Sequence, residues 1–159
     1  RDRSVSRGLG DVYKRQNLGE PIRPLLKVAS GGELSRVALA IKTVLLNASG
    51  VPTMVFDEID TGVGGVTAQK MAEKIAVIAK VGQVLCITHL PQIASFADRH
   101  LLIRKESTGG RTSTGLTVLD EEGRIQELMR MTVGDNVSEV AYANAKELLA
   151  AAAKNKQAR

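Results

Sequence analysis

Three short motifs of this 159-residue chain carry residue types that can bind phosphate or activate water. The first is Ser30-Gly31-Gly32-Glu33, which directly precedes an amphipathic stretch. A Ser followed three residues later by Glu is typical of a capping box, in which each side chain satisfies a backbone N–H group. The two glycines would also let a ligand approach the free amides of a helix N-terminus, which favours anions. On this motif alone, the capping box is the better interpretation, and phosphate binding stays the alternative.

The second motif is the carboxylate pair Asp57-Glu58, which follows an apolar run at residues 51–56. Open parallel sheets bind their ligands at the carboxyl ends of the strands. An aspartate there can hold Mg²⁺, directly or through water, and the next carboxylate can orient a water molecule. The alternative is that two acids simply end a strand; the apolar character of the run shifts the interpretation modestly toward function.

The third motif is His89, which follows a second apolar run at residues 84–88. If the two runs form parallel strands, this histidine lies at the same sheet edge as Asp57 and Glu58. At a phosphate site it would hydrogen-bond the terminal phosphate. A single histidine is more often structural, so His89 alone indicates little. Cys86 lies inside the run and is expected to be a small buried apolar residue.

The elements that must position these motifs follow from the apolar spacing. Steps of three and four after residue 33 predict an amphipathic helix that ends near residues 47–50. Strand, helix to about residue 80 and strand form a βαβ unit. Further expected elements are a short helix from residue 91, strands at 98–104 and 116–119 around a surface turn at 107–114, and helices at about 122–131 and 138–153. The fold class is α/β, a mostly parallel sheet flanked by helices with a small hairpin.

Composition excludes several classes of protein. No apolar run approaches the roughly 18 residues of a membrane span, and one cysteine excludes a disulfide framework or a multi-cysteine zinc site, which fits a reducing cytosol. The formal charge is +5, but residues 1–16 and 154–159 each contribute +3, so residues 17–153 carry −1. A basic total is therefore poor evidence for DNA binding.

The charge distribution also suggests how the chain is divided. Residues 1–16 show no helical or strand period, so they are either a basic arm that grips phosphate or a leader that is non-native or disordered. We favour the second interpretation, because the ordered pattern begins abruptly afterwards. Residues 17–153 are expected to form one folded unit, and residues 154–159 a basic tail.

Taken together, the order and spacing of the motifs carry a resemblance. VASGGELSRVALAI (residues 28–41), TMVFDEIDTGVGG (53–65) and CITHLPQIA (86–94) resemble the signature motif, the Walker B motif with D-loop, and the His-switch of ABC-type ATPase heads. The glutamate in SGGE and the DEID sequence are similar to the SMC-like branch, and most of all to its DNA repair members. The resemblance extends from residue 17 to about residue 150.

That resemblance implies a role for each motif residue. Asp57 would support Mg²⁺, Glu58 would act as general base or orient water, and His89 would contact the γ-phosphate. Asp60 would lie on the D-loop and contact the facing subunit near the nucleotide. ATP bound to the opposite head would meet the signature residues Ser30, Gly31, Gly32 and Glu33. The implied cofactors are ATP and Mg²⁺.

The resemblance also implies what the chain would be part of. No G-x-x-x-x-G-K-[ST] loop occurs in the 159 residues, so the chain resembles the C-terminal lobe of a split P-loop ATPase head, with negligible hydrolysis on its own. The implied partners are the N-terminal lobe of the same head, a second head in an ATP-sandwiched dimer, and DNA, with no membrane. The implied location is the bacterial cytoplasm, associated with the nucleoid.

The implied function is ATP binding and hydrolysis coupled to head pairing in DNA double-strand break repair and recombination. Two alternatives stay open. One is the head of another SMC-like ATPase in chromosome organisation. The other is a non-catalytic docking module, in which the C-terminal helix with Val140, Ala141, Ala145, Leu148 and Ala152 meets a partner instead of packing on its own sheet.

Overall fold

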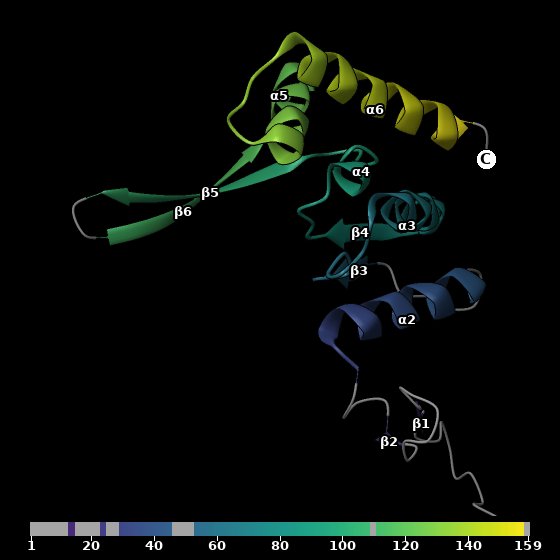
Figure 1. Ribbon diagram of the computed structural model, residues 1–159. Helices are drawn as coiled ribbons and strands as arrows, with labels where there is room; N and C mark the ends of the chain where they lie inside the picture. The colour runs from purple at the N-terminus through teal and green to yellow at the C-terminus, as the bar shows by residue number, and fades with distance from the viewer. Residues whose placement is uncertain (1–12, 15–22, 25–28, 46–52, 109–110, 158–159) are drawn as a thin grey trace, which may run out of the picture.

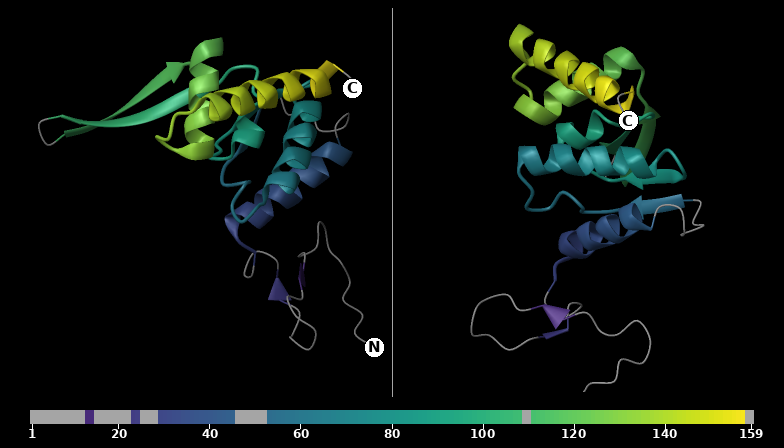
Figure 2. Two further views of the ribbon diagram at one scale, coloured as in Figure 1. Left: turned by 45° about the horizontal axis from the view of Figure 1, so that its top comes forward. Right: turned by 90° about the vertical axis from the view of Figure 1, so that its right-hand side faces the viewer.

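The computed structural model describes residues 13–14, 23–24, 29–45, 53–108 and 111–157 (Figure 1). In chain order its elements are β1 (Tyr13–Lys14), β2 (Arg23–Pro24), α2 (Gly31–Val44), β3 (Thr53–Phe56), α3 (Gly65–Ile78), β4 (Gln83–Cys86), α4 (Pro91–Ala94), β5 (Leu101–Thr108), β6 (Arg111–Val118), α5 (Glu121–Val133) and α6 (Glu139–Gln157). The helices α2, α3 and α6 lie in successive layers, as Figure 2 also shows. The α/β class expected from the sequence is confirmed.

The βαβ unit is present as expected. Strands β3 and β4 pair in parallel, from Thr53 opposite Gln83 to Phe56 opposite Cys86, and α3 forms the crossover between them. One face of this pair packs against α3 in an apolar cluster that contains Phe56, Met71, Ile75 and Ile78. Cys86 is half-buried at the edge of the same cluster, in line with its expected role as a small apolar residue.

The opposite face of the β3–β4 pair is open. Val55 is 63% exposed, Leu85 44% and Ile87 54%. Parallel sheets are normally covered on both faces, so this uncovered face is an unusual feature of the described part of the chain.

Helix α2 begins with the capping box that the sequence predicted. The Ser30 side chain accepts a hydrogen bond from the Glu33 amide at 3.3 Å, and Glu33 Oε2 accepts one from the Ser30 amide at 3.0 Å. The helix ends at Val44, earlier than expected, and the proposed stop at residues 47–50 lies outside the described residues. Leu39 joins α2 to the apolar cluster on α3.

The hairpin is longer than the sequence predicted. Strands β5 and β6 have eight residues each and pair from Leu101 opposite Val118 to Thr108 opposite Arg111. The expected surface turn at residues 107–114 is therefore wrong, because most of it is strand and only residues 109–110 lie between the strands. Thr has a high β-propensity, and cross-strand pairing in register extends the strand through the neighbouring polar residues. The hairpin extends away from the helices (Figures 1 and 2).

A second apolar cluster lies between α5 and α6 and includes Ala94 of α4, together with Ile125, Leu128, Met129, Ala141 and Ala145. Three residues of the expected docking stripe, Ala141, Ala145 and Ala152, are buried within the chain itself. The helix also continues to Gln157, so residues 154–157 of the expected tail are helical.

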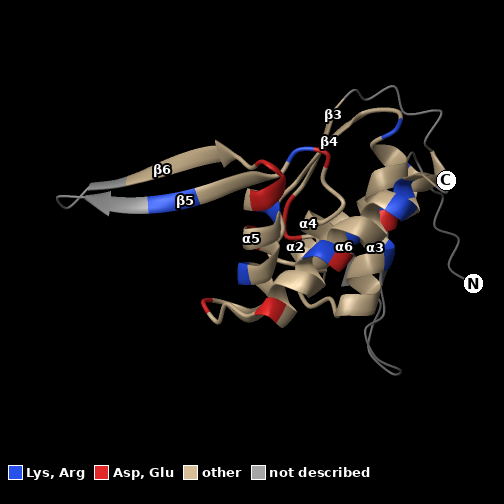
Figure 3. Ribbon diagram, turned by 90° about the horizontal axis from the view of Figure 1, so that it is seen from above, with Lys and Arg blue, Asp and Glu red and all other residues tan. Residues whose placement is uncertain are grey.

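The remaining expectations concern the N-terminus and the charges. Of residues 1–16, only Tyr13 and Lys14 are described, and they pair antiparallel with Arg23 and Pro24; the rest of the expected leader lies outside the described residues. Figure 3 shows basic and acidic residues interspersed along the helices. Across the described segments, no helix is both long and apolar enough to cross a membrane.

Candidate functional site

The first two motifs meet at the N-terminus of α2. The Ser35 hydroxyl donates a hydrogen bond to the Asp57 carbonyl at 3.0 Å. A Cβ atom placed on Gly31 would lie 3.3 Å from Glu58 Oε2, and one on Gly32 would lie 2.7 Å from the Glu58 carbonyl oxygen. The signature glycines therefore lie directly against the segment that follows β3, and Gly32 is needed there because a side chain would collide with backbone.

Arg36 connects α2 to the same segment. Its guanidinium donates to the carbonyl oxygens of Ile59 at 3.2 Å and of Thr61 at 3.0 Å. The two acceptors flank Asp60, so one side chain on α2 sets the path of the backbone on both sides of that aspartate. Arg suits this role because its planar group presents several donors in a fixed geometry.

Glu58 has an uncommon backbone conformation. Its φ is +54°, the only positive φ of a non-glycine residue in the described segments. Such conformations are costly for residues with a Cβ atom and concentrate at functional sites, where the surrounding contacts maintain them. Asp57 and Glu58 are both exposed at the carboxyl end of β3, so their carboxylates are accessible to a ligand.

The third motif joins the site through Asp60. Oδ2 of Asp60 accepts hydrogen bonds from the Thr88 hydroxyl at 2.5 Å and the His89 amide at 2.9 Å. The same oxygen lies 3.1 Å from Nδ1 of His89. Asp60 is only 2% exposed, whereas the His89 side chain is 70% exposed. The buried Asp60 carboxylate therefore contacts both the backbone amide and the Nδ1 atom of His89, whose ring is otherwise exposed.

The electrostatics of Asp60 agree with this geometry. Burial is the largest single effect and raises the pKa of Asp60. Hydrogen bonds from Thr88, from the His89 amide and from its own amide, together with the charge on His89, lower the pKa by more. The net pKa of Asp60 therefore lies below the ordinary value. The pKa of Cys86 is raised to about 11, first by burial and then by the charges of Asp60 and Asp57. Asp60 is therefore ionised at neutral pH, and Cys86 is a thiol.

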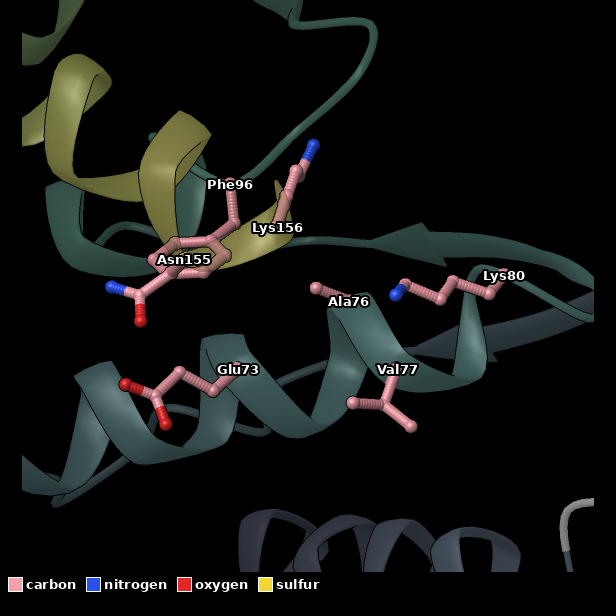
Figure 4. A pocket seen from close by; sticks show the side chains of 7 residues that line it. All are labelled: Glu73, Ala76, Val77, Lys80, Phe96, Asn155 and Lys156. Carbon is pink, nitrogen blue, oxygen red and sulfur yellow. The ribbon is translucent and has the colours of Figure 1, made fainter. Parts of the chain in front are cut away.

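A shallow hollow lies elsewhere, between α3 and α6 (Figure 4). Its walls are formed by Glu73, Ala76, Val77, Lys80, Phe96, Asn155 and Lys156. None of the motif residues lines it. We therefore place the candidate site at the carboxyl edge of β3 and β4, where the polar groups gather, and not in this hollow.

The donor set at that edge suits a hard cation. Mg²⁺ is usually held by one or two carboxylates together with waters and substrate phosphates, and Asp57 and Glu58 offer exposed carboxylate oxygens. Within the described segments, no cluster of three or more His, Cys, Asp or Glu residues could hold a metal on its own. The residues present thus fit a cation that is bound partly by a phosphate ligand.

The structure brings together most of the residues that the sequence singled out. Gly31 and Gly32 lie near Glu58, and Asp60 joins His89 to the same segment. Ser30 and Glu33 form the cap of α2. Sequence reasoning missed three contributors, Ser35, Arg36 and Thr88. A Ser and an Arg within the signature stretch and a Thr beside the histidine were the available signals, but their partners are backbone atoms or lie about 30 residues away.

The fold and the site define an α/β chain with a helix N-terminus, a carboxylate pair and a histidine at one strand edge, an arrangement suited to phosphate ligands. The chain is 51% identical over 144 residues to the DNA repair protein RecN of Halalkalibacterium halodurans, covering 89% of this chain and 26% of that protein. It is 50% identical to RecN of Treponema pallidum, covering 89% and 25%, and 51% identical to RecN of Bacillus subtilis, covering 84% and 23%. The chain therefore belongs with the RecN proteins and matches their C-terminal part.

The coverage of these relatives, the family models and the solved structures were also compared. The chain spans about a quarter of the length of these RecN relatives. No protein-family model matches it. A solved chain from work on the ATP-driven dimerization and DNA-stimulated activation of SMC ATPases is 23% identical, with a TM-score of 0.49, over 72% of this chain and 68% of that chain.

Proposed function

We propose that this chain is the C-terminal lobe of a RecN-type ATPase head, which binds ATP with Mg²⁺ and hydrolyses it in DNA double-strand break repair and recombination. The observation that carries the proposal is the convergence of the α2 N-terminus, the Asp57-Glu58 pair and His89 at one strand edge. The similarity to RecN proteins over most of the chain supports the repair assignment over chromosome organisation.

Each motif residue has a role in this proposal. Asp57 would hold Mg²⁺, which would neutralise phosphate charge when bound. Glu58 would orient or deprotonate the attacking water, and the exposed ring of His89 would hydrogen-bond the γ-phosphate. Phosphoryl transfer needs chiefly positioning and charge neutralisation, so residues fixed by backbone contacts, as Glu58 is beside Gly32, are well suited to it.

The α2 N-terminus would serve a second nucleotide. Ser30 and the amides of Gly31 and Gly32 would meet ATP held by the opposite head, because a helix N-terminus carries free N–H groups and favours anions. Glu33 would maintain the cap that orients Ser30. In this arrangement two heads would enclose two nucleotides, and hydrolysis would be coupled to head pairing.

The N-terminal lobe of the same head is the proposed partner of the open sheet face. The apolar side chains of Val55, Leu85 and Ile87 are uncovered there, and a parallel pair of strands normally has both faces covered and further strands beside it. The lobe that supplies the phosphate-binding loop would cover this face. DNA and the bacterial cytoplasm follow as partner and location from the relation to RecN.

The docking-module alternative has less support. The small residues of α6 that would face a partner, Ala141, Ala145 and Ala152, are already buried against the chain's own elements. Of the other two members of that stripe, Val140 is exposed and Leu148 is half-buried.

An activity measurement on a two-lobe head, reconstituted from this chain and the N-terminal part of a RecN protein, separates the two functions. We expect His89→Ala to lower ATP turnover about 10²-fold or more, the size of a lost positioned catalytic group. Lys70→Ala, an exposed change on α3, should leave turnover unchanged. Unchanged turnover in His89→Ala would favour the docking module.

A further inference from the structure

Asp60 occupies the junction between the segment after β3 and the segment after β4. Three polar atoms of the second segment lie within 3.1 Å of its Oδ2 atom: the Thr88 hydroxyl, the His89 amide nitrogen and Nδ1 of His89. The Thr88 hydroxyl also accepts a hydrogen bond from the Leu90 amide at 3.0 Å. One carboxylate oxygen thus organises the whole turn that carries His89.

The position of Asp60 is itself well determined. The preceding residue, Ile59, is fully buried in the main apolar cluster. Arg36 binds the carbonyl oxygens on both sides of Asp60. The backbone that carries the Asp60 carboxylate is therefore fixed by the packing of Ile59 and by the hydrogen bonds from Arg36 of α2.

The protonation of the His89 ring follows from the charge of the carboxylate beside it. Nδ1 of His89 lies 3.1 Å from Oδ2 of Asp60. An ionised carboxylate has no hydrogen to donate, so its charge favours the ring form that carries the proton on Nδ1. Because Nε2 lies across the imidazole ring from Nδ1 and the side chain is 70% exposed, Nε2 is the atom presented to the open surface.

We propose that Asp60 is a positioning residue for His89, which fixes the imidazole ring with Nδ1–H toward the buried carboxylate and Nε2 toward the ligand. A ring fixed in this way donates from Nε2 only as an imidazolium, whose charge the carboxylate balances. This assignment rests on the proposed function, since His89 is there the residue that meets the phosphate. It concerns Oδ2 of Asp60 and its contacts within this chain, and it is distinct from the contact with a facing subunit that the resemblance implies.

Nitrogen-15 NMR of the histidine rings tests the assignment without any nucleotide. The chain has two histidines, His89 and His100, so a single substitution assigns the spectrum. At alkaline pH, where the neutral ring is observed, we expect His89 to be mainly the Nδ1–H tautomer. Asp60→Ala should reverse the ratio toward Nε2–H, the form that free histidine prefers. Asp60→Asn keeps an acceptor oxygen and should restore Nδ1–H.

Two controls make the result specific. Asp98→Asn removes a carboxylate that pairs with Lys156 of α6 and should leave the His89 tautomer unchanged. The His100 signals report whether each variant is folded. A wild-type ring that is mainly Nε2–H overturns the assignment even if Asp60→Ala does not fold. An unchanged ratio in folded Asp60→Ala overturns it as well. These spectra do not depend on ATPase activity, so failure of the proposed function would leave them as they are.

Discussion

Gly32 packs directly against the backbone of Glu58: a Cβ atom on the glycine would lie 2.7 Å from the glutamate's carbonyl oxygen. The contact joins the first turn of α2 to the residue with the positive φ, +54°. A glycine was expected at this place for the sake of ligand access. The structure adds a second reason, because only a residue without a side chain lets α2 approach the Glu58 backbone.

This contact predicts a specific loss of stability. Gly32→Ala must displace either α2 or the Glu58 backbone, and overpacking of this kind costs about 1–3 kcal/mol. Gly65→Ala is the matched control, since it also lies in the first turn of a helix and its Cβ would meet only Gln92 Nε2 at an ordinary 3.6 Å. There we expect stability to be unchanged or raised by up to about 1 kcal/mol. Urea unfolding of both variants measures the difference, and equal midpoints would contradict the close contact.

Ser30 is expected to have two separable roles. Ser30→Ala removes the cap of α2 and should lower the free energy of unfolding by about 0.5–2 kcal/mol, whereas Ser30→Gly should cost only a few tenths. Both changes remove the hydroxyl proposed to meet ATP, so both should lower turnover in a full-length RecN-type protein. If Ser30→Gly kept full turnover, Ser30 would be a structural cap alone.

The lowered pKa of Asp60 predicts how the free energy of unfolding falls at acid pH. Its pKa is below the ordinary 3.8 in the folded chain, so the unfolded chain binds the proton first. The stabilising contribution is complete above about pH 4 and is lost as the pH falls through the lower native pKa. In Asp60→Asn this part of the acid limb should be missing. Unfolding free energies measured for both proteins at neutral and acid pH check it, and identical acid slopes would contradict the shift.

The raised pKa of Cys86 predicts how stability and thiol reactivity change at alkaline pH. Its pKa of about 11 exceeds the ordinary 9.0, so its contribution to stability is complete below pH 9 and is lost as the pH rises toward 11. At pH 9 the folded chain should hold roughly fifty-fold less thiolate than the unfolded chain, and alkylation should slow accordingly. Iodoacetamide labelling with and without denaturant measures the ratio, with Cys86→Ala as the unreactive control. Equal rates would contradict the raised pKa of the Cys86 thiol.

Local signals predicted much of the fold. The Ser30 and Glu33 spacing predicted the capping box, and two apolar runs around a helical stretch predicted the βαβ unit, because both patterns depend on neighbouring residues alone. The hairpin was predicted too short. Its outer part is polar and carries Gly, Ser and Thr, which resemble turn residues until cross-strand pairing decides otherwise.

The sequence singled out several residues that the structure brings together at the candidate site, but it did not predict the contacts between them. The parallel strands bring Glu58 and His89 to one edge, as the topology requires. The direction of the Asp60 side chain could not be predicted, since it depends on the positive φ of Glu58 and on the donors of Arg36 beside it. Such long-range contacts leave no periodic pattern in a single sequence.

The most direct test of the ATPase proposal is turnover by a full-length RecN-type protein that carries Glu58→Gln. The amide keeps the size of the side chain but cannot accept a proton, so we expect ATP turnover to fall about 10²–10⁴-fold while nucleotide binding is retained. Glu147→Gln, an exposed change on α6, should leave both unchanged. Full turnover in Glu58→Gln would contradict the assignment of this carboxylate, and with it the catalytic site proposed at the end of β3.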